Sequence, residues 1–237
     1  MTSLKDKTVL IIGRGSGIAR AISVAVSDNG GRVIAAGRHP DDLADAYRGM
    51  DIGIERADVT DESSVAALAA RIATVDHVVS TASARARGGF AELTASLVNT
   101  SFATKVTGPL LLAKHFAAKL EAGGSFLFMS GATALKPAPG MLAVAATNAA
   151  VDAVTAGLAV ELAPIRVNAI APGTIDTGAY DALGDERKAA LFGARSAANP
   201  ARRIGTAADI AAAALAALTN GFLTGVSIPV DGGEHLV

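Results

Sequence analysis

Short runs of β-branched residues alternate with longer helical stretches, and this alternation restricts the fold more than any other feature of the sequence. Runs of this kind are typical of strands buried in a parallel sheet. The runs are Thr8–Ile12, Arg32–Ala36, Ile52–Ala57, His77–Ser80, Ser125–Met129, Arg166–Ile170 and Val226–Val230. The stretches between them are rich in Ala and Leu: Gly17–Asn29, Pro40–Tyr47, Asp61–Ala73, Phe90–Leu120, Met141–Leu162 and Thr206–Leu218. This repetition implies right-handed crossovers with helices on both faces, so we predict an α/β fold with a doubly wound parallel sheet of about seven strands.

The whole chain, residues 1–237, is predicted to form one domain. Its 237 residues are 51% hydrophobic and 18% charged, which supplies apolar surface for one large core. No Pro- or Ser-rich linker divides the sequence. Gly108-Pro109 interrupts the stretch Phe90–Leu120, which is therefore expected to hold more than one helical piece.

Composition argues against several classes of function. The net charge is −1, with two Tyr and no Trp, so neither charge nor aromatic stacking favours nucleic acid. The absence of Cys excludes thiol chemistry, and the four His lack the spacing of metal ligands. The uncharged stretch Ile210–Val230 is long enough to span a membrane, but Thr219-Asn220-Gly221 and Pro229 break it. Met1–Lys7 does not resemble a signal peptide, so we expect a cytoplasmic protein. Together with the composition, this predicts a protein with no metal, nucleic-acid or membrane partner.

A glycine-rich turn follows the first predicted strand directly. It reads Gly13-Arg14-Gly15-Ser16-Gly17-Ile18-Ala19 and leads into a helical pattern. Such a turn aims backbone N–H groups and the positive end of a helix at one point, where a pyrophosphate can bind closely. The alternative is an ordinary glycine turn, because the motif alone is weak. Its position after the first strand of an α/β chain favours a dinucleotide site of the Rossmann type.

The end of the second predicted strand indicates which dinucleotide binds. An Asp or Glu about 20 residues after the glycine turn would hold the ribose 2′-hydroxyl of NAD. This sequence has Ala35-Ala36-Gly37-Arg38 there instead. Arg38 can pair with a 2′-phosphate, and Arg14 can add a second positive charge. We therefore predict NADP(H) in preference to NAD(H), the alternative being that both arginines are solvated surface residues.

From about Thr8 to Gly233 the chain resembles the short-chain dehydrogenase/reductase family. Asp58-Val59 resembles the family's adenine-contacting pair, although Asp58 could also be a turn or helix-capping residue. Ile165–Thr177 resembles the sixth strand and the loop that lies over the nicotinamide, where Ile175 would meet the carboxamide and Thr177 the pyrophosphate. Together, the glycine turn and the resemblance imply cofactor contacts at Gly13, Arg14, Ser16, Gly17, Ile18, Arg38, Asp58, Val59, Ser80, Ala82, Pro172, Gly173, Ile175 and Thr177.

The departures from the family pattern fall on the catalytic residues. The family uses a Ser, a Tyr, a Lys four residues after the Tyr, and an Asn on a neighbouring helix. Matching by the family pattern places Gly131, Val144, Asn148 and Lys105 at these four positions. A valine cannot donate a proton, and a positioned general acid is worth roughly 10²–10⁴ in rate. The resemblance therefore implies an atypical member for which carbonyl reduction by Tyr and Lys is not expected.

Three residues are candidates to take over the chemistry. Lys105 could hold the ribose or act as an acid if burial lowers its pKa, or it could be a lysine on a helix surface. Ser130 could bond a substrate or satisfy local backbone groups, and Asn148 could bond a ribose hydroxyl but not serve as an acid. Tyr180 lies in Thr177–Asn199, which resembles the family's mobile substrate loop, although an exposed loop tyrosine is the simpler interpretation.

Two functions remain open at this level. The first is an NADP(H)-dependent oxidoreductase with a reorganised active site. The second is a catalytically inactive NADP(H)-binding sensor or partner subunit, because binding motifs persist where catalytic ones do not. The resemblance also implies a homodimer or homotetramer. A small-molecule substrate is expected, but no motif identifies it.

Overall fold

One seven-stranded parallel sheet organises the molecule. The computed structural model describes residues 4–237, and its sheet has the order β3-β2-β1-β4-β5-β6-β9. The strands are β1 (Thr8–Ile12), β2 (Arg32–Gly37), β3 (Ile52–Arg56), β4 (Val75–Ser80), β5 (Leu120–Met129), β6 (Arg166–Pro172) and β9 (Ser227–Val230). Every neighbouring pair is parallel. The predicted doubly wound α/β fold is confirmed, and all seven predicted strands are present, with shifts of at most two residues at their ends except in β5, which begins at Leu120 instead of Ser125.

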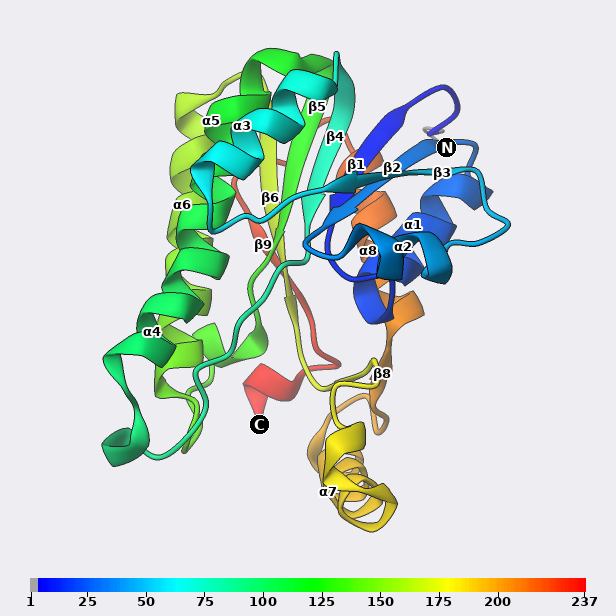
Figure 1. Ribbon diagram of the computed structural model, residues 1–237. Helices are drawn as coiled ribbons and strands as arrows, with labels where there is room; N and C mark the ends of the chain where they lie inside the picture. The colour runs from blue at the N-terminus through cyan, green and yellow to red at the C-terminus, as the bar shows by residue number, and fades with distance from the viewer. Residues whose placement is uncertain (1–3) are drawn as a thin grey trace.

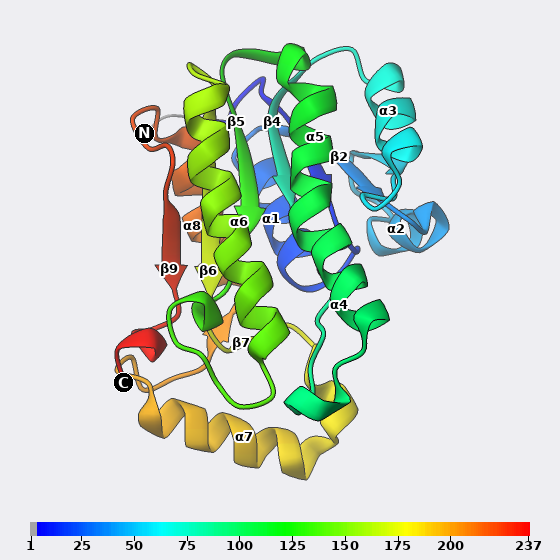
Figure 2. The same cartoon turned by 90° about the vertical axis from the view of Figure 1, so that its left-hand side faces the viewer.

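Helices cover both faces of this sheet (Figures 1 and 2). One face carries α3 (Glu62–Arg71), α5 (Gly108–Phe116) and α6 (Leu142–Glu161), and the other carries α1 (Gly17–Asp28) and α8 (Ala207–Thr219). The remaining elements are α2 (Pro40–Ala46), α4 (Ala95–Phe102), α7 (Asp185–Ala198) and the short strands β7 (Ile175–Asp176) and β8 (Gly205–Thr206). Figure 2 shows α4 and α7 at the end of the sheet to which the strands point.

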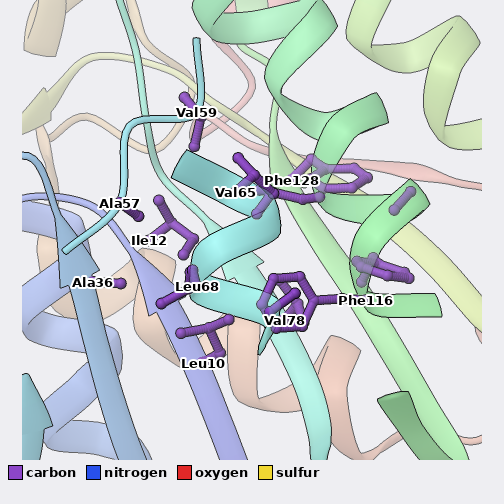
Figure 3. Close-up of a cluster of buried hydrophobic side chains, with 14 of the residues drawn as sticks. Leu10, Ile12, Ala36, Ala57, Val59, Val65, Leu68, Val78, Phe116 and Phe128 are labelled. Atoms are coloured by element: carbon purple, nitrogen blue, oxygen red, sulfur yellow. The ribbon is translucent and has the colours of Figure 1, made fainter. Parts of the chain in front are cut away.

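The core on the α3–α5–α6 face is built from large side chains (Figure 3). Phe116 of α5 is fully buried there, together with Phe126 and Phe128 of β5. The rings of Phe126 and Phe128 stack with centroids 5.9 Å apart. Leu68 of α3 and Val78 of β4 belong to the same cluster. This packing fixes α5 against the sheet, and α5 continues the helical segment that carries Lys105.

Replacing Phe116 with alanine should therefore destabilise the protein strongly. We expect a loss of about 3–5 kcal/mol in the free energy of unfolding, because a large buried ring leaves a cavity. Urea denaturation followed by circular dichroism measures this value. Phe222 is 100% exposed and provides the matched control, since its replacement should leave the denaturation midpoint nearly unchanged. Equal midpoints for the two variants would contradict the described packing.

The long helical stretch predicted over Phe90–Leu120 is divided as expected. It consists mainly of α4, the π-helical segment Ala103–Thr107 and α5, which starts at Gly108. Gly108 also lets the chain approach the neighbouring loop, because an added Cβ would lie 3.0 Å from Cβ of Val59. Lys105 lies inside the π-helical segment, so its direction follows from that irregular turn rather than from α-helical periodicity.

One further segment differs from expectation and another agrees with it. Thr177–Asn199, interpreted as a loop, contains α7, whose many charged residues give it no buried face. The apolar stretch Ile210–Val230 is divided between α8 and β9, as its turn residues predicted. Among residues 4–237, one helix, α6, has the length and apolar composition that crossing a membrane requires. One face of α6 packs on the sheet core through Val151, which accounts for part of that apolar character.

Candidate cofactor and substrate site

The predicted site residues gather at the carboxyl ends of β1 and β4. These two strands are neighbours in the middle of the sheet, and the chain winds outward from them in opposite directions. In open α/β sheets, such a switch point opens a crevice beyond the strand ends, and ligands bind there. Four segments meet around it: the glycine turn after β1, the loop after β4, the π-helical segment and the loop after β6.

The glycine turn leads directly into the N-terminus of α1. Ser16 precedes α1, but its side chain makes no capping hydrogen bond, and no acidic residue lies in the first turn of α1. The first N–H groups of a helix have no partner within the helix, so an anion can bind them. Gly17 has a φ of +55°, a backbone conformation that glycine adopts without strain. An added Cβ on Gly13 would lie 2.2 Å from Oγ1 of Thr81, so this turn fits its surroundings only as glycine.

The loop after β6 lies against the same turn. An added Cβ on Gly17 would lie 3.1 Å from Cβ of Thr177, which places Thr177 beside the start of α1. Pro172 ends β6, and Ile175 is buried in β7. Gly173 passes close to Asp231, since an added Cβ would lie 2.7 Å from the Cβ of that residue. The structure thus brings together two predicted cofactor segments that are about 160 residues apart.

Arg14 and Arg38 are both exposed at this end of the sheet. Arg14 belongs to the glycine turn, and Arg38 directly follows β2. Within residues 4–237, neither guanidinium forms an ion pair with a carboxylate. The residues present therefore fit a dinucleotide: helix donors face the pyrophosphate position, and two uncompensated cations are available for a further phosphate.

The other predicted adenine-side residues have local roles as well. Oδ1 of Asp58 accepts hydrogen bonds from N and Oγ1 of Thr60 at 2.9 and 2.7 Å, as a turn residue does. Val59 is buried and packs against Gly108. Ser80 is buried at the end of β4, and Ala82 lies two residues further along the loop. Their contact with a cofactor stays a prediction.

Lys105 is enclosed at the end of the crevice nearest α6. Its side chain is 6% exposed, so the interpretation as a surface lysine is wrong. Its Nζ donates to the backbone oxygen of Ser130 at 3.1 Å and to Oδ1 of Asn148 in a short contact. Ser130 in turn donates from Oγ to the backbone oxygen of Asn148 at 3.1 Å. All three candidate catalytic residues therefore belong to one hydrogen-bonded cluster.

Burial, and after it the nearby charge of Arg85, lower the pKa of Lys105 from 10.5 to about 7. The carboxylate of Asp152 on α6 opposes this shift only partly. Desolvation disfavours the ammonium form because water is excluded from around the charge. A lysine in this range can both hold and release a proton near neutral pH, which a surface lysine cannot do.

The backbone of Gly131 lies in close contact with the side-chain amide of Asn148. Nδ2 of Asn148 donates to Oγ1 of Thr133 at 2.7 Å, and its Oδ1 faces Lys105. An added Cβ on Gly131 would lie 2.5 Å from Nδ2 of Asn148. A larger residue at position 131 must therefore displace an amide that two partners hold. Val144 is buried one turn earlier on α6 and brings only methyl groups to this region.

Replacing Gly131 with alanine should destabilise the protein by about 1–3 kcal/mol, as insertion of a methyl group into a filled site does. The amide of Asn148 would have to move and weaken its bonds to Lys105 and Thr133. Thermal unfolding measures the change. Gly157 on α6 is the matched control, because an added Cβ there meets no atom within 4 Å. Its replacement should raise stability by about 0.5–1 kcal/mol, since alanine favours a helix. If both variants behaved alike, the crowding at Gly131 would be disproved.

Several residues of this site were not singled out from the sequence. Thr133 orients Asn148, Asp152 acts on the charge of Lys105, and Arg85 and Arg87 lie in the loop after β4. The Ala-Arg-Ala-Arg pattern at 84–87 was the available signal, since alternate residues of an extended segment face opposite ways. Tyr180 is half-buried rather than an exposed loop residue, and its ring contacts Arg87 and Phe192.

Comparison with known proteins agrees with this fold and crevice. Residues 12–235 match the family model described as enoyl-(acyl carrier protein) reductase. The short-chain dehydrogenase/reductase ucsE of Acremonium sp is 30% identical over 98% of this chain and 96% of its own. ATR9 of Stachybotrys chlorohalonatus, another short-chain dehydrogenase/reductase, is 30% identical over the full length of both chains, 100% of each.

Solved structures show the same similarity. A small-chain dehydrogenase in complex with NADPH has a TM-score of 0.83 and 32% identity, over 98% of this chain and 100% of its own. The MalC reductase/Diels-Alderase of Malbranchea aurantiaca has a TM-score of 0.90 and 28% identity, over 99% and 98% of the two chains. A doubly wound sheet with a glycine turn at its switch point is the fold of dinucleotide-binding proteins. This chain belongs to the short-chain dehydrogenase/reductase family.

Proposed function

We propose that the protein is an NADP(H)-dependent oxidoreductase with a non-standard active site, in which Lys105 supplies the proton. The observation that carries this proposal is the enclosed ammonium of Lys105, whose pKa of about 7 suits acid–base work near neutral pH. NADPH bound in the crevice would supply the hydride. Lys105 would release a proton from Nζ to the oxygen of a carbonyl substrate, while Ser130 and Asn148 hold the amine in place.

The preference for NADP(H) is part of the same proposal. Arg38 and Arg14 are exposed cations without an acidic partner among residues 4–237, and no Asp or Glu stands at the end of β2 to bind a ribose 2′-hydroxyl. The structural relative crystallised with NADPH supports this choice. Arg38 would pair with the 2′-phosphate, and the start of α1 would receive the pyrophosphate.

A second function, an inactive NADP(H)-binding protein, is favoured by a different observation. Both acceptors of Lys105 Nζ are protein atoms, which gives this lysine a structural explanation, and Val144 offers no proton. In that case the protein would bind NADPH and act as a sensor or a partner subunit. Both functions require that the protein binds NADPH, and only the oxidoreductase also transfers its hydride to a substrate.

Titration of the purified protein with NADPH and NADH by calorimetry, followed by a screen of aldehydes and ketones, separates these functions. The oxidoreductase proposal expects micromolar NADPH binding, weaker NADH binding and loss of NADPH absorbance with at least one carbonyl class. Binding without turnover across the screen would support the inactive binding protein. Failure of both nucleotides to bind would refute both functions.

A further inference from the structure

The loop after β4, one of the four segments around the switch point, carries two arginines, Arg85 and Arg87. The loop is held in three places: Thr81 N donates to Ile12 O at 2.8 Å, Ser101 Oγ to Ala84 O at 2.8 Å, and Gly88 N to Gly140 O at 3.0 Å. Ala86 is buried, whereas Arg85 and Arg87 are exposed. The loop therefore presents two guanidinium groups from a backbone that is already ordered.

The segment after β7 contacts one of these arginines. The guanidinium carbon of Arg87 lies 5.9 Å from the ring centroid of Tyr180, in the segment after β7. A cation over an aromatic ring uses the flat face of the guanidinium, which leaves its N–H groups available in the plane. Arg85 lies close enough to Lys105 for its charge to lower the pKa of that lysine. The two arginines thus extend from Tyr180 inward to the proposed proton donor.

No acid compensates these charges within residues 4–237. Arg85 and Arg87 form no ion pair, and the pKa of Arg85 is lowered first by desolvation and then by the charges of Arg87 and Arg14. Some cations at the same end of the molecule are paired, namely Lys188 with Asp176 and Asp181, Arg195 with Glu234, and Arg203 with Asp209, whereas Arg14 and Arg38 are unpaired in the described part of the chain, like the two arginines of this loop. Like charges held side by side repel each other, and an anion that binds both relieves that repulsion. The two guanidinium groups are therefore available to a negatively charged ligand.

We propose that Arg85 and Arg87 bind a carboxylate on the substrate, so that this enzyme acts on carbonyl compounds that carry a carboxylate beside Lys105. The proposal rests on the proposed oxidoreductase function and names its substrate class. A guanidinium matches a carboxylate with two parallel N–H···O bonds, which fixes the direction in which the carbonyl enters. The same chemistry would suit a phosphate of the cofactor, so the test separates these two anions.

Calorimetry tests the proposal without requiring turnover. The protein saturated with NADP⁺, which cannot reduce a ketone, is titrated with pyruvate, with levulinate and with the methyl ester of each acid. We expect at least one acid to bind ten times or more tightly than its ester. Arg85→Gln and Arg87→Gln should each weaken the binding of that acid by about tenfold to a hundredfold, the usual effect of losing a charge-assisted hydrogen bond. The affinity for NADP⁺ should not change.

The control is Arg32→Gln, which removes the same charge at the opposite end of β2, where Arg32 donates to Oγ1 of Thr8 at 2.9 Å. This substitution should change neither the affinity for the acid nor the affinity for NADP⁺. Equal binding of acids and esters would overturn the proposal. So would weaker NADP⁺ binding in the Arg85 and Arg87 variants with unchanged acid binding, since the arginines would then hold a cofactor phosphate. If the acid binds as expected but NADPH is never oxidised, the oxidoreductase function fails while the carboxylate site stands.

Discussion

Replacing Lys105 with methionine should lower the rate of carbonyl reduction by about 10²–10⁴, the usual contribution of a positioned general acid. Methionine has a similar length and keeps the pocket filled, but it has no proton to give and no charge. NADPH binding should change little, because Lys105 bonds Ser130 and Asn148 rather than the glycine turn. Single-turnover oxidation of bound NADPH measures the hydride step itself.

The pH dependence supplies a second readout for the same residue. A lysine with a pKa of about 7 is protonated below that pH, so the reduction rate of the wild type should fall as pH rises through 7. Stability should move the opposite way. Between pH 7 and 10.5 the folded state binds fewer protons at Lys105 than the unfolded state, so the wild type should gain stability relative to Lys105→Met as pH rises.

Lys114→Met on α5 is the matched control. This lysine is exposed and pairs with Glu62 on the surface, so its loss should cost no more than about 1 kcal/mol and leave the rate profile unchanged. A Lys105→Met enzyme that kept the rate and the pH profile of the wild type would assign this lysine a purely structural role.

Replacing Arg38 with alanine should weaken NADPH binding by roughly ten- to a hundredfold, the effect of losing a charge-assisted bond to a phosphate. NADH lacks the 2′-phosphate, so its affinity should stay the same or rise slightly. The ratio of the two dissociation constants, obtained by calorimetry, is therefore the quantity to measure. Raising the salt concentration should reduce the NADPH advantage of the wild type, because screening weakens contacts between exposed charges.

Arg32→Ala is the control for this prediction too, because Arg32 and Arg38 flank the same strand at opposite ends. It should leave both nucleotide affinities unchanged. Equal losses for NADPH and NADH in the Arg38 variant would mean that this residue supports the nucleotide site in general rather than the 2′-phosphate. If Arg14→Ala alone removed the preference, the phosphate would belong to the glycine turn.

The sequence predicted the sheet well because strands and helices leave different periodic patterns. Thr8–Ile12 was predicted with its observed ends, and Arg166–Ile170 was short by two residues. The helix Asp185–Ala198 escaped notice because it has no buried face, and a pattern of apolar residues is what sequence analysis detects. The position of the crevice could be predicted from chain order, because the glycine turn directly follows the first strand.

The chemistry of the site was harder to predict from the sequence. The burial of Lys105 depends on a local departure from α-helical geometry, which periodic patterns do not reveal. The fit between Gly131 and Asn148 depends on a contact between residues 17 positions apart, on a strand end and a helix. Arg85 and Arg87 became informative only when the structure placed Arg87 against the ring of Tyr180 and the charge of Arg85 near Lys105.

The π-helical segment Ala103–Thr107 makes the position of Lys105 depend on the number of residues in the chain. Each residue of an α-helix turns the chain by about 100°, so one residue more or less changes which side chain faces the sheet. Deleting one residue from this segment would let α4 continue regularly into α5 and would rotate the ammonium away from Ser130. Relatives that differ by one residue here would then present another side chain to the crevice, even where the surrounding sequence is the same. Insertions and deletions at this point are therefore a route by which one scaffold can exchange the side chain that it places beside Ser130 and Asn148.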